Sequence, residues 1–291
     1  MRYYPKISIV TPVYNRHEYL EETILSVINQ NYPNLEYIII DGGSNDGTVD
    51  IIKKFESKLA YWISEPDGGM YFALQKGFVK ATGEILAWIN SDDKYIDKSL
   101  FAVAQIFSDL SEIEWIMGMP TLLNEEGICV KISQGRRWSE SRFYAGDFRW
   151  IQQDSVFWKR SLWDRTGRVL DTSYKYAGDF ELWCRFFQST QLFTVSSSFS
   201  GFRSHGDQIS IQYLKEYESE TTEIIQKIKP PPGNALRYKI IKQIWELRNC
   251  FDIQGFLFTK YFPIILTWFV DKMHKCPPQI YYDVTEKKWK K

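Results

Sequence analysis

The feature that most constrains this chain is a regular alternation of apolar runs and amphipathic segments over its first hundred residues. The apolar runs are compact and rich in β-branched and aromatic residues, and they occupy residues 7–10, 37–40, 61–63 and 85–89. The segments between them have apolar residues at helical spacing, and they occupy residues 16–29, 48–55 and 70–81. Such an alternation predicts a parallel sheet with helices on its faces and right-handed crossovers.

The pattern after residue 100 is more mixed. We expect helices over residues 97–109, 179–188 and 212–229. We expect strands over 115–119 and 129–132, on either side of a turn at 124–127, and a linker at Pro230-Pro231-Pro232-Gly233. The sequence therefore predicts a domain over 1–210, with halves 1–100 and 101–210, and a helical C-terminal region over 211–291.

The composition of the chain supports a folded protein and argues against a nucleic-acid binder. Of its 291 residues, 44% are hydrophobic and 16% aromatic, which is enough for a large core. The 36 Lys and Arg balance 36 Asp and Glu, whereas a nucleic-acid binder is usually basic. The charge is uneven, because residues 230–291 hold eleven bases and five acids, a net +6, and the rest carries −6. An acidic body therefore precedes a basic, aromatic C-terminal region.

Cysteine spacing and hydropathy favour a reduced, cytoplasmic protein. The four cysteines, at positions 129, 184, 250 and 276, are scattered and form no CxxC pair, which disfavours a disulfide framework or a zinc site. The N-terminal residues show no apolar leader segment, so we expect no signal peptide. The most apolar late run, residues 261–270, is well short of the ~20 residues that a membrane span needs, so we expect no transmembrane helix.

Polar or flexible residues follow each of the four predicted strands. These strand-end segments are Thr11–Asn15, Asp41–Gly47, Glu65–Gly69 and Asn90–Asp93. The carboxyl ends of parallel strands lie at one edge of a sheet, where ligands bind. Glycines allow close backbone approach and carboxylates hold divalent cations, so this edge suits a nucleotide with a metal ion. The P-loop and GxGxxG patterns are absent, which disfavours ordinary NTPases and dinucleotide dehydrogenases.

Six motifs in a fixed order carry a family resemblance. They are TPVYN, IIIDGGSNDGT, SEPDGGMYFALQKG, ATGEILAWINSDD, QQDSVFWKR and AGDFELWCRF. Together they resemble the inverting family 2 glycosyltransferases of the GT-A fold, over roughly residues 5–205. The resemblance implies a Rossmann-like, mostly parallel α/β sheet, a nucleotide-sugar donor, and Mg²⁺ or Mn²⁺ as cofactor.

The resemblance also implies a set of donor-binding residues. The expected nucleotide-sugar contacts are Thr11, Pro12, Tyr14, Asp41, Asp67, Asn90 and Ser91. Family members often have a second acid after the one at Asp41, but this chain has Gly42. A turn-capping role for Asp41, and a plain loop role for Asp67, remain open. UDP is the favoured nucleotide, with GDP and dTDP as alternatives.

The Asn90-Ser91-Asp92-Asp93 segment matches the metal motif of the family, with Asn90 in place of its first acid. The resemblance implies Asp92 as the main metal ligand and Asp93 as a secondary one. His205 matches a late histidine that meets the metal or the diphosphate. The alternatives are a helix N-cap for one of the acids and a structural role for the histidine.

Asp179 matches the carboxylate that serves as general base in the family. The resemblance implies that it takes the proton of the acceptor hydroxyl as the oxygen attacks the anomeric carbon. Family members commonly have Glu before this Asp, where this chain has Gly178. An N-cap role for Asp179 is the alternative. The segment with Gln152, Gln153 and Trp158 matches the acceptor side.

We therefore expect an inverting glycosyltransferase acting in polysaccharide or glycolipid assembly. The alternatives are a non-catalytic nucleotide-sugar-binding protein and a sugar nucleotidyltransferase. The acceptor is expected to be a saccharide or a lipid-linked one. The basic, aromatic residues 236–291 suit contact with an anionic membrane, at its inner face, but packing on the catalytic domain and a homodimer contact are equally open.

Overall fold

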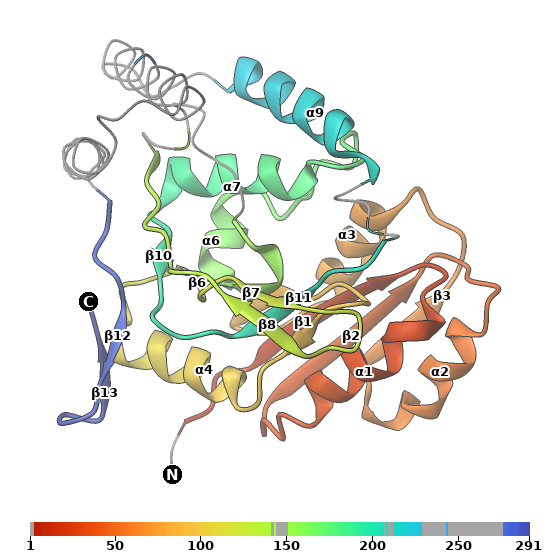
Figure 1. Cartoon of the computed structure of the whole chain (residues 1–291), viewed down its shortest axis with the longest axis horizontal. Coiled ribbons are helices and arrows are strands. Elements are labelled where there is room, and N and C mark those ends of the chain that lie inside the picture. Colours follow the sequence, from red (N-terminus) through yellow and green to blue (C-terminus); the bar gives the residue numbers. More distant parts are fainter. Residues whose placement is uncertain are drawn as a thin grey trace.

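The computed structural model of the chain describes residues 3–140, 143, 151–206, 208, 212–228, 243 and 276–291. Its centre is a seven-stranded sheet (Figure 1). Its strands are β1 (Ile7–Val13), β2 (Leu35–Asp41), β3 (Tyr61–Ser64), β4 (Ile85–Trp88), β6 (Trp115–Met117), β9 (Val156–Lys159) and β10 (Phe193–Thr194). They lie in the order β10-β6-β9-β4-β1-β2-β3.

The four predicted strands of the first hundred residues form the parallel part of this sheet. β1 pairs with β2 from Ile7↔Leu35 to Val13↔Asp41, and with β4 through Val10↔Trp88. β2 pairs with β3 in the same direction, whereas β9 lies antiparallel between β4 and β6. Because β1 lies between β2 and β4, the strand order reverses there, and the crevice at their carboxyl ends is the expected ligand site.

Helices cover both faces of the sheet (Figure 1). One face packs against α1 (His17–Ile28), α2 (Thr48–Lys54), with the short 3-10 turn η1 (Glu56–Lys58) after it, and α4 (Ser99–Asp109). The other packs against α3 (Met70–Lys80), α6 (Arg160–Arg165), α7 (Gly178–Ser189) and α9 (Leu214–Lys227). Alternate strand residues point to opposite faces, so each face has its own apolar core. The predicted mostly parallel α/β sheet is confirmed.

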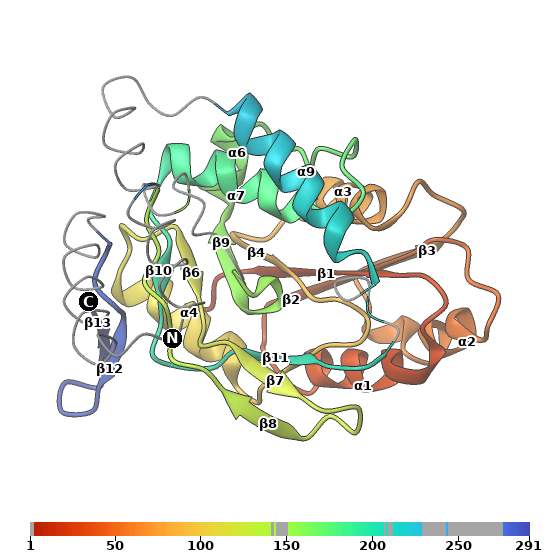
Figure 2. The same ribbon diagram turned by 45° about the horizontal axis from the view of Figure 1, so that its top comes forward.

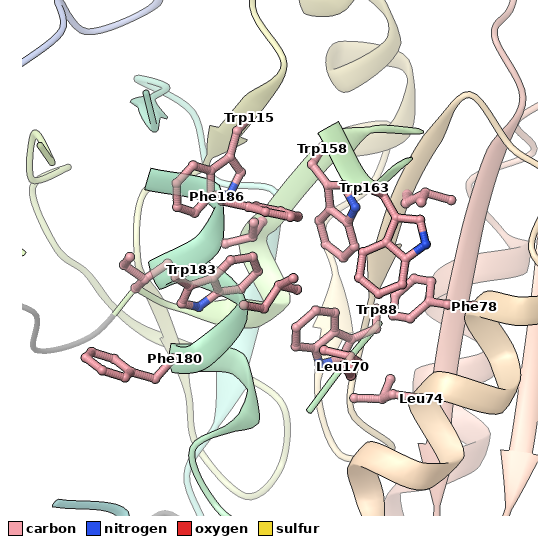
Figure 3. Close-up of a cluster of buried hydrophobic side chains, with 14 of the residues drawn as sticks. Leu74, Phe78, Trp88, Trp115, Trp158, Trp163, Leu170, Phe180, Trp183 and Phe186 are labelled. Carbon is pink, nitrogen blue, oxygen red and sulfur yellow. The ribbon is translucent and has the colours of Figure 1, made fainter. Parts of the chain in front are cut away.

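The core beneath α7 is unusually aromatic (Figure 3). Trp88 of β4 stacks on Trp183 of α7, with ring centroids 5.6 Å apart and planes at 7°. Trp158 of β9 packs edge-on against both, and its exposed fraction is 0%. Large buried rings contribute much of the apolar area of a core, so α7 sits on a well-filled support.

A second, four-stranded sheet adjoins the first (Figure 2). It contains β5 (Lys94–Tyr95), β11 (Ser200–Arg203), β7 (Thr121–Leu123) and β8 (Cys129–Ile132). The predicted turn between β7 and β8 is confirmed by a hydrogen bond from the amide of Asn124 to the carbonyl of Ile128. β11 runs antiparallel to β5, so the residues that follow β11 come to lie beside those that precede β5.

The end of the chain corrects part of the expected helical region. Residues 281–290 form a strand pair, β12 (Tyr281–Asp283) and β13 (Lys288–Lys290), and this hairpin lies beside α4 (Figure 1). Trp289 is only 7% exposed, and its amide donates to Asp109 at 2.9 Å. The lysines at 288, 290 and 291 form ion pairs with acids. The hairpin therefore packs on α4, because Trp289 anchors it to the core beneath that helix.

The helix predicted at 212–229 is found as α9, and it also packs on the domain, with Ile224 buried in the α7-side core. The predicted linker at residues 230–233 and most of the basic, aromatic stretch before residue 276 lie outside the described residues. Within the described parts of the chain, no helix is both long and apolar enough to cross a membrane.

Candidate active site

The loop after β4 carries the predicted metal ligands. Asp92 Oδ2 lies 3.0 Å from Nε2 of His205, which follows β11 and is 113 residues away in sequence. The Asp92 side chain is 16% exposed and that of His205 is 3% exposed. The imidazole also packs on the Tyr19 ring of α1, with centroids 5.0 Å apart. The structure thus brings Asp92 and His205 together at the carboxyl end of β4.

Asp93 has a different position from its neighbour. It is fully buried, and its two carboxylate oxygens accept hydrogen bonds from the amide of Arg203 at 2.9 Å and from the side chain of Asn90 at 3.3 Å. Burial, with Asp154 and Asp92 nearby, raises its pKa well above the usual value. Asp93 is thus more buried than Asp92 and its oxygens hold the loop to β11, so its role as a secondary metal ligand stays a prediction.

Asp179 lies in the first turn of α7. The hydroxyl of Tyr71, in the first turn of α3, donates to Asp179 Oδ1 at 3.1 Å. Burial raises the pKa of Asp179 to about 6, with the hydrogen bonds from the Phe180 amide and Tyr71 acting against the rise. Such a carboxylate is mostly ionised at neutral pH and has a pKa near that of an effective general base.

Thr11 of β1 and Asp41 at the end of β2 have mainly structural contacts. Thr11 is fully buried, and its hydroxyl lies 3.0 Å from that of Tyr37. Asp41 is also fully buried and organises the turn after β2. It accepts the amides of Gly43 and Ser44 at 3.1 and 2.9 Å, and the hydroxyl of Ser64 at 2.6 Å. The turn-capping role of Asp41 is therefore observed.

Gly42, Asp67 and Tyr14 lie close together just after the end of β2. A Cβ added at Gly42 would lie 3.3 Å from Asp67 Oδ1 and 3.4 Å from the Tyr14 ring, which is 62% exposed. Asp67 Oδ1 accepts the amide of Gly69 at 2.8 Å. Within the described residues, Asp67 Oδ2 and Asn90 Oδ1 are buried without hydrogen-bond partners. Unpartnered buried oxygens are rare, and a ligand that donates to them would satisfy both.

The chain is similar to known glycosyltransferases. Residues 8–113 match the family described as Glycosyl transferase family 2. Over this segment the chain is similar to glycosyltransferase family 2. It is 28% identical over 237 residues to an uncharacterized glycosyltransferase of Rickettsia prowazekii, covering 78% of this chain and 73% of that one. It is 37% identical over 94 residues to TuaG of Bacillus subtilis, whose name assigns it provisionally to teichuronic acid biosynthesis, covering 31% and 37%.

Solved structures show that this glycosyltransferase has the GT-A fold. TarS 1–349 of S. aureus, in complex with UDP-GlcNAc, superposes with a TM-score of 0.59 at 16% identity, over 92% of this chain and 81% of that one. The mannosyltransferase PcManGT of Pyrobaculum calidifontis, with GDP-Man and Mn²⁺, gives 0.60 at 19% identity, over 88% and 77%. At these identities the likeness concerns the fold.

Asp92 after β4 and His205 after β11 are the two side chains that lie together where a cation is expected. In the described part of the chain, no group of three or more His, Cys, Asp or Glu side chains converges as a metal site. Mg²⁺ typically takes one or two carboxylates and completes its shell with substrate phosphates and water. The donor set of Asp92 and His205 therefore fits a metal that is bound together with a diphosphate.

Of the predicted acceptor-side residues, Trp158 is corrected, whereas Gln152 and Gln153 are half-buried and stay predictions. Trp158 is fully buried in the aromatic core, so it cannot contact an acceptor. Gln153 donates to the carbonyl of Trp88 at 2.7 Å, and Gln152 donates to the carbonyl of Thr121 at 3.2 Å. These two side chains join β9 to β4 and β7, because their amides are used in hydrogen bonds within the domain.

Sequence reasoning missed two buried residues beside the site: Arg203, which holds the Asn90–Asp93 loop (the metal loop), and Asp154, which is hydrogen-bonded to β11. Arg203 is 1% exposed; its Nε donates to the carbonyl of Asp92 at 2.8 Å, and its Nη2 pairs with Glu22 of α1 at 2.6 Å. Asp154 lies in the short 3-10 turn η2 (Gln153–Ser155) and accepts the Ser200 hydroxyl at 2.6 Å. Burial raises the pKa of Asp154 to about 6. Asp154 lies within the motif QQDSVFWKR, which could have identified it, whereas the sequence around Arg203 contains no such signal.

Proposed function

We propose that this chain transfers a sugar from a nucleotide sugar to an acceptor hydroxyl, with inversion at the anomeric carbon. The observation that carries the proposal is the placement of Asp179. Its carboxylate is hydrogen-bonded to Tyr71, four residues after Asp67 in the loop that follows β3. A desolvated carboxylate with a pKa of about 6 thus adjoins the edge of the sheet where the donor is expected.

The chemistry needs one proton acceptor and a leaving nucleoside diphosphate. As the acceptor oxygen bonds to the anomeric carbon, its proton passes to the carboxylate of Asp179. The bond between the anomeric carbon and the diphosphate oxygen breaks on the opposite face, and the diphosphate leaves with that electron pair. One displacement inverts the configuration, so no covalent enzyme intermediate is required. Positioning of the two substrates supplies much of the rate enhancement.

Asp92 and His205 are the residues that would hold Mg²⁺ or Mn²⁺ with the diphosphate. A bound cation would neutralise the charge that develops on the leaving group. Asn90 and Asp67, whose buried oxygens have no partners within the described residues, are proposed donor contacts together with Tyr14 and Gly42. The contacts proposed for Pro12 and Ser91 rest on their positions at the ends of β1 and β4.

UDP is the favoured donor nucleotide, with GDP and dTDP as alternatives. The fold neighbours include proteins solved with UDP-GlcNAc and with GDP-Man, which supports a nucleotide sugar as the donor. The similarity to TuaG supports a role in bacterial-type surface polysaccharide or glycolipid assembly, with a saccharide or a lipid-linked acceptor.

A donor panel is the first test of this function. Thermal stability is measured with UDP-, GDP- and dTDP-sugars, each with and without Mn²⁺, and one donor is expected to raise the melting temperature in a Mn²⁺-dependent way. Release of the nucleoside diphosphate is then followed with saccharide and lipid-linked acceptors. Donor binding without turnover on any acceptor would favour a non-catalytic nucleotide-sugar-binding protein, and no donor binding would contradict the proposal.

We also propose a peripheral membrane contact, at the inner face of the cell membrane, through the basic residues that precede the hairpin. Lys239→Glu combined with Lys242→Glu is expected to reduce sedimentation with anionic vesicles, because polybasic segments gain about 1 kcal/mol per residue near such a surface. Lys53→Glu with Lys54→Glu, on exposed α2, is the matched control. Equal sedimentation of both double variants and the wild type would reject this contact. A homodimer contact would then be tested by measuring the molecular mass in solution.

A further inference from the structure

Asp179 is held by two helices that come from distant parts of the chain. From α3, the hydroxyl of Tyr71 lies 3.1 Å from Asp179 Oδ1 and 3.0 Å from the carbonyl oxygen of Tyr176. Tyr71 is only 3% exposed, so both contacts are shielded from water. A hydroxyl has a single proton, so it alternates between these acceptors and keeps the side chain of Asp179 beside the loop that precedes α7.

Gly178 makes the approach of Tyr71 to this helix end feasible. A Cβ at residue 178 would lie 2.8 Å from two carbons of the Tyr71 ring, closer than Cβ contacts normally come. The ring therefore lies against the bare backbone before the base. The position at which the family resemblance expects Glu is thus filled here by Gly178 and the Tyr71 ring together.

From α9, Glu220 caps the same loop. Its Oε1 accepts the amide of Lys175 at 2.9 Å, and its Oε2 accepts the amides of Tyr176 and Ala177 at 2.9 and 2.7 Å. These amides precede α7, where a carboxylate is favoured by the helix dipole. α9 itself is anchored by Thr221 and Ile224, both 1% exposed.

We propose that Tyr71 and Glu220 are positioning residues for the general base, and that Gly178 serves to admit the Tyr71 ring. Tyr71 orients the carboxylate of Asp179, and Glu220 fixes the backbone from which that carboxylate projects. This assignment rests on the proposed function, because it takes Asp179 as the base. It also gives α9 a role in catalysis, although α9 lies beyond all six motifs of the family.

The two positioning residues act on the charge of Asp179 in opposite directions. The hydrogen bond from Tyr71 favours the carboxylate and lowers its pKa, whereas the negative charge of Glu220 raises it. Burial, followed by the charge of Asp179, raises the pKa of Tyr71 well above its usual value, so its hydroxyl stays protonated.

The other titratable groups around Asp179 carry little net charge. Burial raises the pKa of Tyr217 of α9 and of Cys184 of α7 well above their usual values, so both stay neutral. Glu181 of α7 forms a two-contact ion pair with Arg185, at 2.7 Å for each contact, so their charges offset each other. Tyr71 and Glu220 are thus the two groups whose removal should move the titration of Asp179.

The test is the pH dependence of kcat/KM in the full chain, with the donor and acceptor found by the panel. Tyr71→Phe is expected to lower kcat and to move the acid limb upward by about half a unit to one unit, since one hydrogen bond to a charge is lost. Glu220→Gln is expected to move the limb downward, and to lower kcat because the loop loses acceptors for its amides.

Matched controls separate these shifts from general loss of stability. Tyr32→Phe removes a buried hydroxyl that donates to the carbonyl of Pro5 at 2.8 Å, far from Asp179 in sequence and on the opposite core. Glu223→Gln removes an exposed charge of α9 that pairs with Lys227 at 2.5 Å. Neither control should move the acid limb.

The outcomes separate this inference from the proposed function. The inference would be overturned if the apparent pKa of the acid limb is unchanged in both Tyr71→Phe and Glu220→Gln, and kcat falls only as far as stability falls. If Glu220→Gln does not fold, Tyr71→Phe decides alone. A cycle with Gly178→Ala adds a second measure, because the effects of Gly178→Ala and Tyr71→Phe should be clearly non-additive. Near-native transfer by Asp179→Asn would instead overturn the proposed function.

Discussion

The two ends of the proposed site use the same functional group in opposite settings. At the metal loop, Asp92 keeps some exposure and has an imidazole 3.0 Å away. At the start of α7, Asp179 is desolvated, and within the described residues its side-chain contact is the Tyr71 hydroxyl. A partly exposed carboxylate beside an imidazole can bind a cation. A desolvated carboxylate has a raised pKa and can instead accept a proton. Environment, more than residue type, assigns the two roles.

The largest expected effect separates the two carboxylates by activity. Asp179→Asn should lower the rate of transfer by about 10²- to 10⁴-fold, the range of general acid–base contributions, because the amide cannot accept the proton. Affinity for the donor should stay within about twofold, since Asp179 is not a proposed donor ligand. Transfer is measured as release of nucleoside diphosphate, and donor affinity by calorimetry. A variant that loses donor affinity and activity together would place Asp179 in the donor pocket.

The reverse pattern is expected at the metal loop. Asp92→Asn and His205→Ala should each weaken the Mn²⁺-dependent part of donor affinity by about tenfold or more, as loss of groups in a metal site commonly does. The control is His17→Ala, which removes an imidazole from an exposed pair with Asp46, also at 3.0 Å. Calorimetric titration of donor with and without Mn²⁺ measures the difference. Unchanged metal dependence in both variants would remove Asp92 and His205 as ligands.

The desolvation of Asp179 also predicts a pH-dependent gain in stability. A carboxyl whose folded pKa is about 6, against an ordinary value of 3.8, binds its proton more tightly when folded. Its ionisation therefore destabilises the folded state progressively as the pH rises from about 4 to 6, and fully above that. Asp179→Asn removes this penalty, so the unfolding free energy should rise by about 3 kcal/mol at pH 8 and change little at pH 4. Denaturant unfolding at the two pH values tests this, and an equal change at both would contradict the desolvated state.

The smallest effect on activity is expected at Trp158. Trp158→Phe should lower the unfolding free energy by about 2 kcal/mol through the cavity it leaves in the aromatic core. The KM for the acceptor should stay unchanged, because the side chain is fully buried. A raised acceptor KM in a variant of unchanged stability would show that Trp158 contacts the acceptor and is not only a core residue.

Sequence reasoning succeeded where the signal was local. Apolar runs identified the parallel strands, and the strand ends located Asn90–Asp93 and the loop with Asp67, because topology brings such ends to one edge. The closeness of Asp92 and His205 came from family resemblance, and the pairing of β11 with β5 gives its physical cause.

What the sequence could not supply depends on contacts between distant segments. Tyr71 and Glu220 are 149 positions apart, and each looks like an ordinary residue of an amphipathic helix. Arg203 shows its role only once β11 lies beside the metal loop. Trp158 was misjudged because a motif position was taken for an exposed contact, although its neighbours Val156 and Phe157 already favoured a buried strand. The hairpin at 281–290 could not be predicted because its strands are short and its lysines indicate a membrane-contacting segment as readily as a strand pair.

The pH profile of kcat/KM for transfer, measured on the wild type and on Asp179→Asn with the donor found by the panel, tests the central claim most directly. The wild type should show an acid limb with an apparent pKa near 6, because burial raises the pKa of Asp179 to about that value. Residual transfer in the variant should lack this limb. A wild-type profile that is flat down to pH 4.5, or near-native transfer by Asp179→Asn, would contradict Asp179 as the base of this glycosyltransferase.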